Sequence, residues 1–195
     1  KHRLACCATH DQDDTPRERR TGCAARSGWK PKRVAISRDL GLPPVDREVA
    51  DIVMRAAGKL EAEGVIVEEA HPDLHEAYDC AQTLRALSYA NMRPLLEAHR
   101  DLLKPEVIWN IEKGISLTGA EIARAETQRA AMFARMRQFF ETYDLLLCPT
   151  TIVAPYPVEQ RYVAECDGVK FGTYVDWLTI VSAITLTCSP AISIP

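Results

Sequence analysis

A strand, a helix and a second strand follow one another between Arg33 and Val67, and this succession constrains the fold more than any other feature. The segment Val34-Ala-Ile-Ser37 is short and apolar, as a buried strand is, and Val65-Ile-Val67 is similar. Between them, apolar residues recur at helical spacing along one stripe. These residues are Val49, Val53, Ala56, Ala57 and Leu60. A strand, a crossover helix and a strand of this length form a βαβ unit with parallel strands, so the pattern predicts an α/β fold.

Local signals mark the ends of this first helix. The dipeptide Pro43-Pro44 predicts a turn, and Asp46 is a natural N-cap because its carboxylate can accept from a free backbone N–H. Gly64 stands where a glycine with positive φ commonly ends a helix.

A mainly helical stretch follows the second strand. Asp73 is expected to cap a helix that runs through Leu84 and Leu87, and Pro94 and Pro105 mark later turns. Further on, Thr118-Gly-Ala-Glu121 has the spacing of a capping box. It predicts the start of the longest helix, which continues to Phe140.

The last third of the chain returns to strand and loop patterns. Tyr143-Asp-Leu-Leu-Leu-Cys-Pro149 predicts a buried strand that ends at the proline. A loop of roughly twenty residues follows, long enough to suggest a functional rim. We expect one more helix from Tyr174 to about Ile184 and a final strand over Ala191-Ile-Ser-Ile194.

The charge distribution separates the first residues from the rest. Of the 24 Lys/Arg and 27 Asp/Glu, nine and four fall within residues 1–33, so this part is basic and the remainder acidic. Residues 1–24 show no strand or helix period, and we expect a disordered basic arm that is not necessarily native to the protein. It lacks aromatic residues interleaved with the basic ones, which argues against nucleic-acid binding. Residues 25–195 then form the folded part.

Cysteine usage and hydropathy indicate the compartment. Seven cysteines make an odd count without framework spacing, which favours reduced thiols and a cytoplasmic location. Cys148 ends an apolar run, so we expect a buried thiol that reacts slowly. No apolar run approaches the roughly 20 residues of a membrane helix, and Lys1-His2-Arg3 is not followed by a signal sequence, so we expect no membrane association.

Common catalytic and metal-binding motifs are not found. The chain has no Gly-x-Ser-x-Gly elbow, no phosphate loop and no Gly-x-Gly-x-x-Gly fingerprint. Two clusters contain cysteine or histidine, residue types that commonly bind metals. They are Cys6, Cys7 and His10 with Cys23, and His71 with His75. Tetrahedral zinc usually needs two closely spaced pairs of ligands, so we expect free thiols and surface histidines, and no metal or cofactor.

Several segments, taken in order, resemble the amidase signature family. They are Arg33-Val-Ala-Ile-Ser-Arg-Asp-Leu-Gly-Leu-Pro-Pro-Val-Asp-Arg-Glu-Val49, Glu63-Gly-Val-Ile-Val-Glu-Glu69, Phe139-Phe-Glu-Thr-Tyr-Asp-Leu-Leu-Leu-Cys-Pro-Thr150, Tyr174-Val-Asp-Trp177 and Thr185-Leu-Thr-Cys-Ser-Pro-Ala-Ile-Ser-Ile-Pro195. The resemblance covers about Ala25 to Pro195. It implies the carboxyl-terminal part of an amidase domain, truncated at both ends, with a mixed β-sheet core flanked by helices.

The resemblance implies hydrolysis of small carboxylic amides to an acid and ammonia or an amine, without a cofactor. Family members use a serine nucleophile, a second serine in a cis peptide as proton relay, and a lysine base, in a loop with Gly-Gly and Ser-Ser pairs. This sequence contains neither pair. We therefore carry over no catalytic residue and expect the isolated segment to be inactive. A binding or structural subunit that has lost catalysis is the alternative, and homo-oligomer formation through open sheet edges is also left open.

Four residues are candidates for substrate binding. Thr150 and Thr151 follow a buried strand, and Tyr174 and Trp177 are three positions apart, which places both on one face of a helix. By the family resemblance they would form part of the acyl-pocket wall. The alternative is that the aromatic residues belong to the core and the threonines cap a turn.

Overall fold

The computed structural model describes residues 30–42 and 44–193. The predictions for the arm over residues 1–24 and for the cluster of Cys6, Cys7, His10 and Cys23 lie outside these residues.

Three short parallel strands form the main sheet. They are β1 (Arg33–Ile36), β2 (Ile66–Glu69) and β3 (Leu145–Leu147), in the order β2-β1-β3. Val34 in the central strand pairs with Val67 on one side and Leu145 on the other. The central strand is buried because both its neighbours and the helices cover it. The predicted α/β class and parallel βαβ pairing are confirmed.

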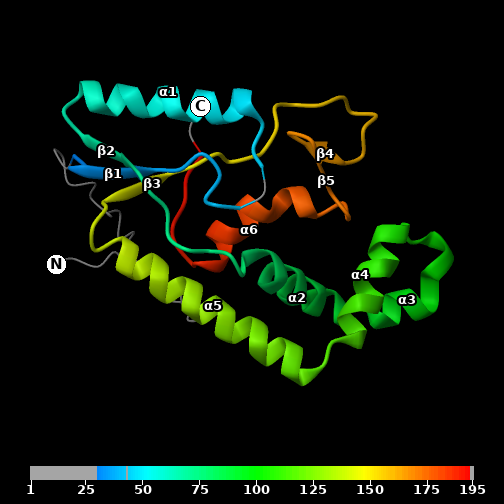
Figure 1. Ribbon diagram of the computed structural model, residues 1–195. Coiled ribbons are helices and arrows are strands. Elements are labelled where there is room, and N and C mark those ends of the chain that lie inside the picture. The colour runs from blue at the N-terminus through cyan, green and yellow to red at the C-terminus, as the bar shows by residue number, and fades with distance from the viewer. Residues whose placement is uncertain (1–29, 43, 194–195) are drawn as a thin grey trace, which may run out of the picture. The chain divides into compact units, whose positions relative to one another are not determined.

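Helix α1 (Arg47–Ala62) connects β1 to β2 along one side of the sheet (Figure 1). Its N-cap is Asp46, whose Oδ1 accepts from the Glu48 N–H at 2.8 Å, as predicted. Gly64, just beyond the helix, has a φ of +83°, a conformation that L side chains rarely adopt. Both predicted ends of the helix are confirmed.

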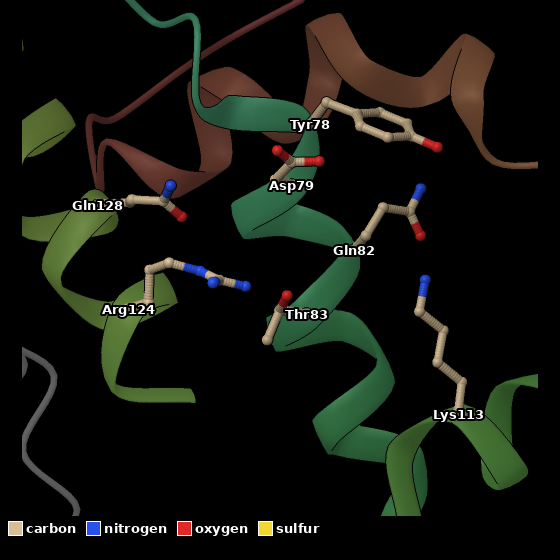
Figure 2. Close-up of a pocket in the computed structure, with 7 residues that line it drawn as sticks. All are labelled: Tyr78, Asp79, Gln82, Thr83, Lys113, Arg124 and Gln128. Carbon is tan, nitrogen blue, oxygen red and sulfur yellow. The ribbon is translucent and has the colours of Figure 1, made fainter. Parts of the chain in front are cut away.

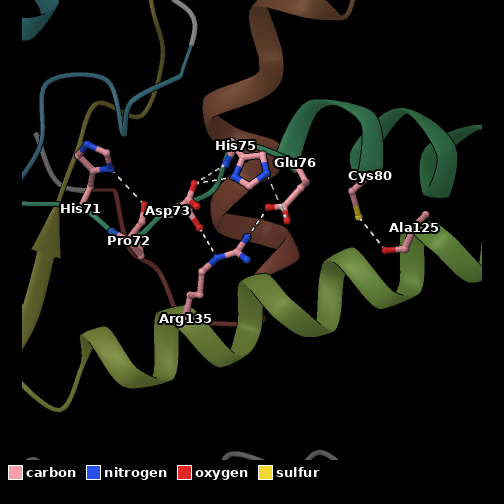
Figure 3. A network of polar contacts seen from close by, with 8 residues as sticks. All are labelled: His71, Pro72, Asp73, His75, Glu76, Cys80, Ala125 and Arg135. Atoms are coloured by element: carbon pink, nitrogen blue, oxygen red, sulfur yellow. Dashed lines mark hydrogen bonds and ion pairs between the residues drawn. The ribbon is translucent and has the colours of Figure 1, made fainter.

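Helix α2 (Ala77–Ala90) begins later than the sequence suggests, and Asp73 does not cap it. The N-cap is Glu76, which makes no side-chain capping bond. Asp73 Oδ1 instead accepts from the His75 N–H at 3.1 Å and lies 2.8 Å from His75 Nδ1, as Figure 3 shows. The prediction that Asp73 caps this helix was wrong, because the Asp73 carboxylate is bonded to His75 in a turn that precedes the helix. Arg135 holds this turn, donating to the Asp73 carbonyl at 2.6 Å and pairing with Glu76.

Three helical segments follow, and their starts agree with the sequence signals. They are α3 (Arg93–His99), α4 (Pro105–Ser116) and α5 (Gly119–Phe139), with a 3₁₀ turn η1 (Arg100–Leu102) between α3 and α4. Pro94 and Pro105 lie in the first turns of α3 and α4, where a missing N–H costs least. The capping box at α5 is confirmed, since Thr118 and Glu121 each accept from the other's backbone N–H.

The segment after β3 differs in part from the prediction. The long loop contains a small antiparallel hairpin of β4 (Glu165–Cys166) and β5 (Val169–Lys170). The expected helix is divided into a 3₁₀ turn η2 (Asp176–Leu178) and helix α6 (Thr179–Leu186). Residues 191–193 form no strand, because no neighbouring strand lies beside them in the part of the chain that the structure describes.

Helices α2, α5 and α6 lie on the side of the sheet opposite α1 (Figure 1). Apolar side chains of these helices and of the segment before α2 meet in one core, which includes Leu74, Met132, Met136 and Ile180, each at most 2% exposed. Within residues 30–42 and 44–193, no helix combines the length and the apolar character needed to cross a bilayer.

Candidate functional site

The carboxyl ends of the three parallel strands lie at one edge of the sheet. Ser37 follows β1, Ala70 follows β2 and Cys148 follows β3. In open α/β sheets ligands bind in the crevice outside this edge. The loop after β3 is fixed there, because the Asp46 N–H donates to the Ile152 carbonyl at 2.7 Å. Asp46 also caps α1, so one residue ties the loop to the helix.

This loop forms most of an apolar hollow of about 340 Å³. Its lining residues are Thr151, Val153, Ala154, Pro155, Tyr156 and Trp177. The size falls near the lower end of the usual range for ligand pockets, roughly 300 to 1,000 Å³. The hollow can hold an apolar group of modest size next to the carboxyl edge of the sheet.

The indole of Trp177 is held in a fixed orientation. Its Nε1 donates to the Tyr174 carbonyl at 3.0 Å, and its ring stands edge-on to Tyr156, with centroids 6.1 Å apart. Because the indole N–H is already bonded to the backbone, the side chain presents its apolar surface to the hollow.

The structure brings together Thr151 and Trp177 but not the other two predicted residues. Thr150 is exposed, and its Oγ1 lies 3.4 Å from Ser193 Oγ. Tyr174 precedes η2 and packs edge-on against Trp109 and Tyr162. The expected common helical face of Tyr174 and Trp177 is therefore absent, because the helix starts after Tyr174.

Sequence reasoning missed Val153, Ala154, Pro155 and Tyr156 as lining residues. The signal that could have found them was the length and proline content of the loop after β3, which suggested a rim without indicating which side chains turn inward.

A polar network beneath Tyr174 supports this region. Arg85 donates to Asn110 Oδ1 at 2.6 Å and to Gln82 Oε1 at 2.9 Å. Asn110 Nδ2 donates to the Tyr174 hydroxyl, and the Arg85 guanidinium lies about 6 Å from the rings of Trp109 and Tyr174. The network fixes Tyr174, whose carbonyl in turn accepts from Trp177.

Asp176 sets the start of η2. Its carboxylate accepts from the Gly172 and Thr173 N–H groups at 2.8 and 2.9 Å, from the Tyr78 hydroxyl and from the Thr173 hydroxyl. Burial opposes ionisation, but the hydrogen bonds from Thr173, Tyr78 and Gly172 together lower the pKa of Asp176. The Asp176 carboxylate therefore has a structural role, because its hydrogen bonds hold the segment before η2.

The candidate nucleophile and metal ligands that follow β3 and β2 in the chain are Cys148, His71 and His75. Cys148 is partly buried, less so than predicted, and burial raises the pKa of its thiol to about 11. His71 Nδ1 lies 3.1 Å from the Pro72 carbonyl, and His75 pairs with Asp73. Across the residues that the structure describes, no group of three His, Cys, Asp or Glu side chains is arranged to hold a metal ion.

The parallel sheet defines an α/β fold, and its apolar hollow lies beyond the carboxyl end of β3, at the edge where open α/β sheets commonly bind ligands. The chain belongs to the amidase family, whose model matches residues 3–195. The resemblance noted in the sequence is thereby confirmed.

Individual relatives agree with this assignment. An acylamidase from Rhodococcus erythropolis is 28% identical over 176 residues, which cover 88% of this chain and 37% of the relative. The structure is similar to a solved amidase (TM-score 0.72, 20% identity), covering 82% of this chain and 37% of that one. It is also similar to a bacterial aryl acylamidase of the amidase signature family (TM-score 0.67, 19% identity), covering 81% and 35%. The chain thus spans little more than a third of the length of these relatives.

Proposed function

We propose that this chain is part of an amide hydrolase, in which it supplies the sheet and one wall of the acyl pocket. The observation that carries the proposal is the joining of Thr151 and Trp177 in an apolar hollow directly after β3. An apolar wall with few polar groups suits the acyl or aryl portion of a small amide, which is desolvated on binding.

The reaction would convert a carboxylic amide to an acid and ammonia or an amine, without a metal or organic cofactor. The nucleophilic serine, the cis-serine relay and the lysine base would come from the region that this chain does not contain. A base within hydrogen-bond reach activates the hydroxyl, and backbone N–H groups stabilise the oxyanion. The cysteines within the described residues are all free, which agrees with a reducing, cytoplasmic compartment.

A chimera tests the proposal. The segment of the Rhodococcus acylamidase matched by this chain is replaced with the corresponding residues of this chain, and hydrolysis of an aromatic acyl anilide is measured. We expect turnover in the chimera. Within it, Trp177→Ala should raise KM for the aromatic substrate about tenfold, because an apolar contact of roughly 1 to 2 kcal/mol is lost. The KM for a small aliphatic amide should change less.

Two further variants serve as controls. Trp177→Phe keeps an apolar ring and should restore most of the affinity, while Thr150→Val changes an exposed threonine outside the hollow and should leave KM unchanged. A folded chimera without turnover would favour the alternative, a binding or structural subunit derived from the fold. If Trp177→Ala and Thr150→Val change KM equally, the hollow is not part of the acyl pocket.

A further inference from the structure

A second hollow, of about 290 Å³, lies over α2 between α4 and α5, and its lining is polar (Figure 2). Its lining residues are Tyr78, Asp79, Gln82, Thr83, Lys113, Arg124 and Gln128. None of them lines the hollow after β3. Helix α2 and the consecutive helices α4 and α5 therefore contribute to one polar site.

Gln82 provides a fixed hydrogen-bond donor at this site. The residue is 9% exposed, and its Oε1 accepts from Arg85 Nη2 at 2.9 Å. Since Arg85 can only donate, this bond assigns the oxygen and the nitrogen of the Gln82 amide. Within residues 30–42 and 44–193, Gln82 Nε2 donates no hydrogen bond, and it stays open to solvent. A largely buried side chain thus lines the hollow with an N–H group that a ligand can reach.

Two cations reach the same face of α2 from opposite sides, Lys113 from α4 and Arg124 from α5 (Figure 2). Lys113 Nζ lies 5.0 Å from the ring centroid of Trp109, which holds the ammonium by a cation–π contact. Neither cation has a carboxylate within 4 Å in the part of the chain that the structure describes. Asp79 is the single acid among the lining residues, so the lining carries a net positive charge.

We infer that this hollow binds a small monocarboxylate. A carboxylate only accepts hydrogen bonds, and the site offers the free N–H of Gln82 and the ammonium of Lys113, with Arg124 adding positive potential from the other side. Asp79 offsets one of the two positive charges, which favours a monoanion over a dianion such as phosphate. The inference concerns binding alone and stands whether or not the proposed amide hydrolysis is correct.

The test compares benzoate with benzamide, two ligands of similar shape that differ in charge. Each is titrated into the full chain at constant ionic strength by isothermal titration calorimetry, with the total tryptophan fluorescence, to which Trp109 contributes, as a second readout. We expect saturable binding of benzoate and none of benzamide. Lys113→Gln should weaken benzoate binding about tenfold, because one charge-assisted hydrogen bond is lost.

Lys59→Gln is the matched control, since Lys59 is an exposed lysine on α1 and its replacement changes the net charge equally. It should leave benzoate affinity unchanged. Gln82→Glu, which keeps the bond to Arg85 but replaces the N–H donor with a carboxylate oxygen, should abolish binding. Three results overturn the inference: benzamide binding as well as benzoate, Lys113→Gln behaving like Lys59→Gln, or inorganic phosphate binding more tightly than benzoate at the same site.

Discussion

Asn110 on α4 donates a hydrogen bond from Nδ2 to the hydroxyl of Tyr174, 2.5 Å away and 64 positions along the chain. The amide is 1% exposed, and its Oδ1 accepts from Arg85 while its Nδ2 also donates to the Glu106 carbonyl. One side chain therefore joins α2, α4 and the segment that leads into Trp177. Buried amides of this kind are costly to remove, because their partners stay buried.

We predict that Asn110→Ala lowers the free energy of unfolding by about 2 to 3 kcal/mol, since Arg85 and Tyr174 lose a buried partner. Urea unfolding followed by circular dichroism measures the change. Asn91→Ala, an exposed asparagine at the end of α2, should change stability by less than about 0.5 kcal/mol. Similar values for the two variants would mean that the network contributes little.

Close packing of α2 against α4 at Gly114 leads to a second prediction. A Cβ at Gly114 would lie 2.2 Å from the Ala86 carbonyl oxygen and 2.9 Å from the Ala90 nitrogen. Both contacts are with backbone atoms, so the helices would have to move apart. Gly114→Ala should destabilise the chain by about 1 to 3 kcal/mol or more.

Gly58→Ala is the matched control for Gly114. Gly58 lies inside α1, and nothing stands within 4 Å of an added Cβ. Alanine there should stabilise the chain by roughly 0.5 to 1 kcal/mol, the usual difference in helix propensity. Thermal unfolding of both variants gives the comparison, and the two changes should have opposite signs. A stabilising Gly114→Ala would contradict the observed packing.

The elements that the sequence predicted correctly depend on neighbours close in the chain. The capping box of Thr118 and Glu121 and the cap at Asp46 each satisfy free backbone groups within three residues, so spacing alone identifies them. The βαβ unit follows from the order of its parts. Asp73 does not cap the helix, because the Asp73 carboxylate accepts a hydrogen bond from the His75 N–H before the helix begins.

The site was less accessible to sequence reasoning because its residues come from distant segments. Trp177 and Thr151 line the same hollow although they are far apart in the sequence. Tyr174 accepts a hydrogen bond from Asn110, which no local sequence pattern indicates. Helical spacing suggested that Tyr174 and Trp177 share a face, but Asp176 starts the turn between them. Side chains from three helices line the polar hollow over α2, so no single sequence motif predicts it.

Thiol reactivity should distinguish Cys148 from Cys188. Burial raises the pKa of Cys148 to about 11, so its thiolate is scarce at neutral pH, whereas Cys188 is exposed. We expect a maleimide reagent at neutral pH to label Cys188 much faster than Cys148, as measured by peptide mass spectrometry over time. In 6 M urea the two rates should converge. Faster labelling of Cys148 in the folded chain would contradict its burial.

Asp144 should contribute to the dependence of stability on acid. Its Oδ2 accepts from the Arg33 and Lys32 N–H groups at 3.0 and 2.7 Å, and these bonds lower the pKa of Asp144 below its ordinary value of 3.8. A lowered pKa in the folded state gives stability that is present above about pH 4 and lost as the pH falls through the folded value.

Asp144→Asn should therefore flatten the decline in stability below pH 4 and cost less than about 1 kcal/mol near neutral pH, because the group is exposed. Urea midpoints measured across the acid range provide the test. Asp101→Asn, on the exposed turn η1, is the control and should leave the shape of the curve unchanged. The expectation fails if the two variants have the same acid profile.

The final prediction is that the purified chain hydrolyses no amide above background. A serine hydroxyl is a weak nucleophile without a base within hydrogen-bond reach, and positioned acid–base help alone gives roughly 10² to 10⁴ in rate. Ser37 Oγ accepts from the Leu40 N–H, and Ser88 and Ser116 donate to carbonyl groups of their own helices. Within residues 30–42 and 44–193, no serine hydroxyl is bonded to a lysine or histidine nitrogen.

The assay uses simple aliphatic and aromatic amides, first with the chain itself and then with each serine changed to alanine. Turnover that persists in every serine variant comes from a contaminant or from the medium. Turnover that disappears with a single substitution would identify a nucleophile in this chain, and the assignment of catalysis to the region outside it would then be wrong. We expect no turnover, with the chain itself or with any serine variant. The oxyanion donors and the lysine base act together with the nucleophile, and each alone provides only part of the rate.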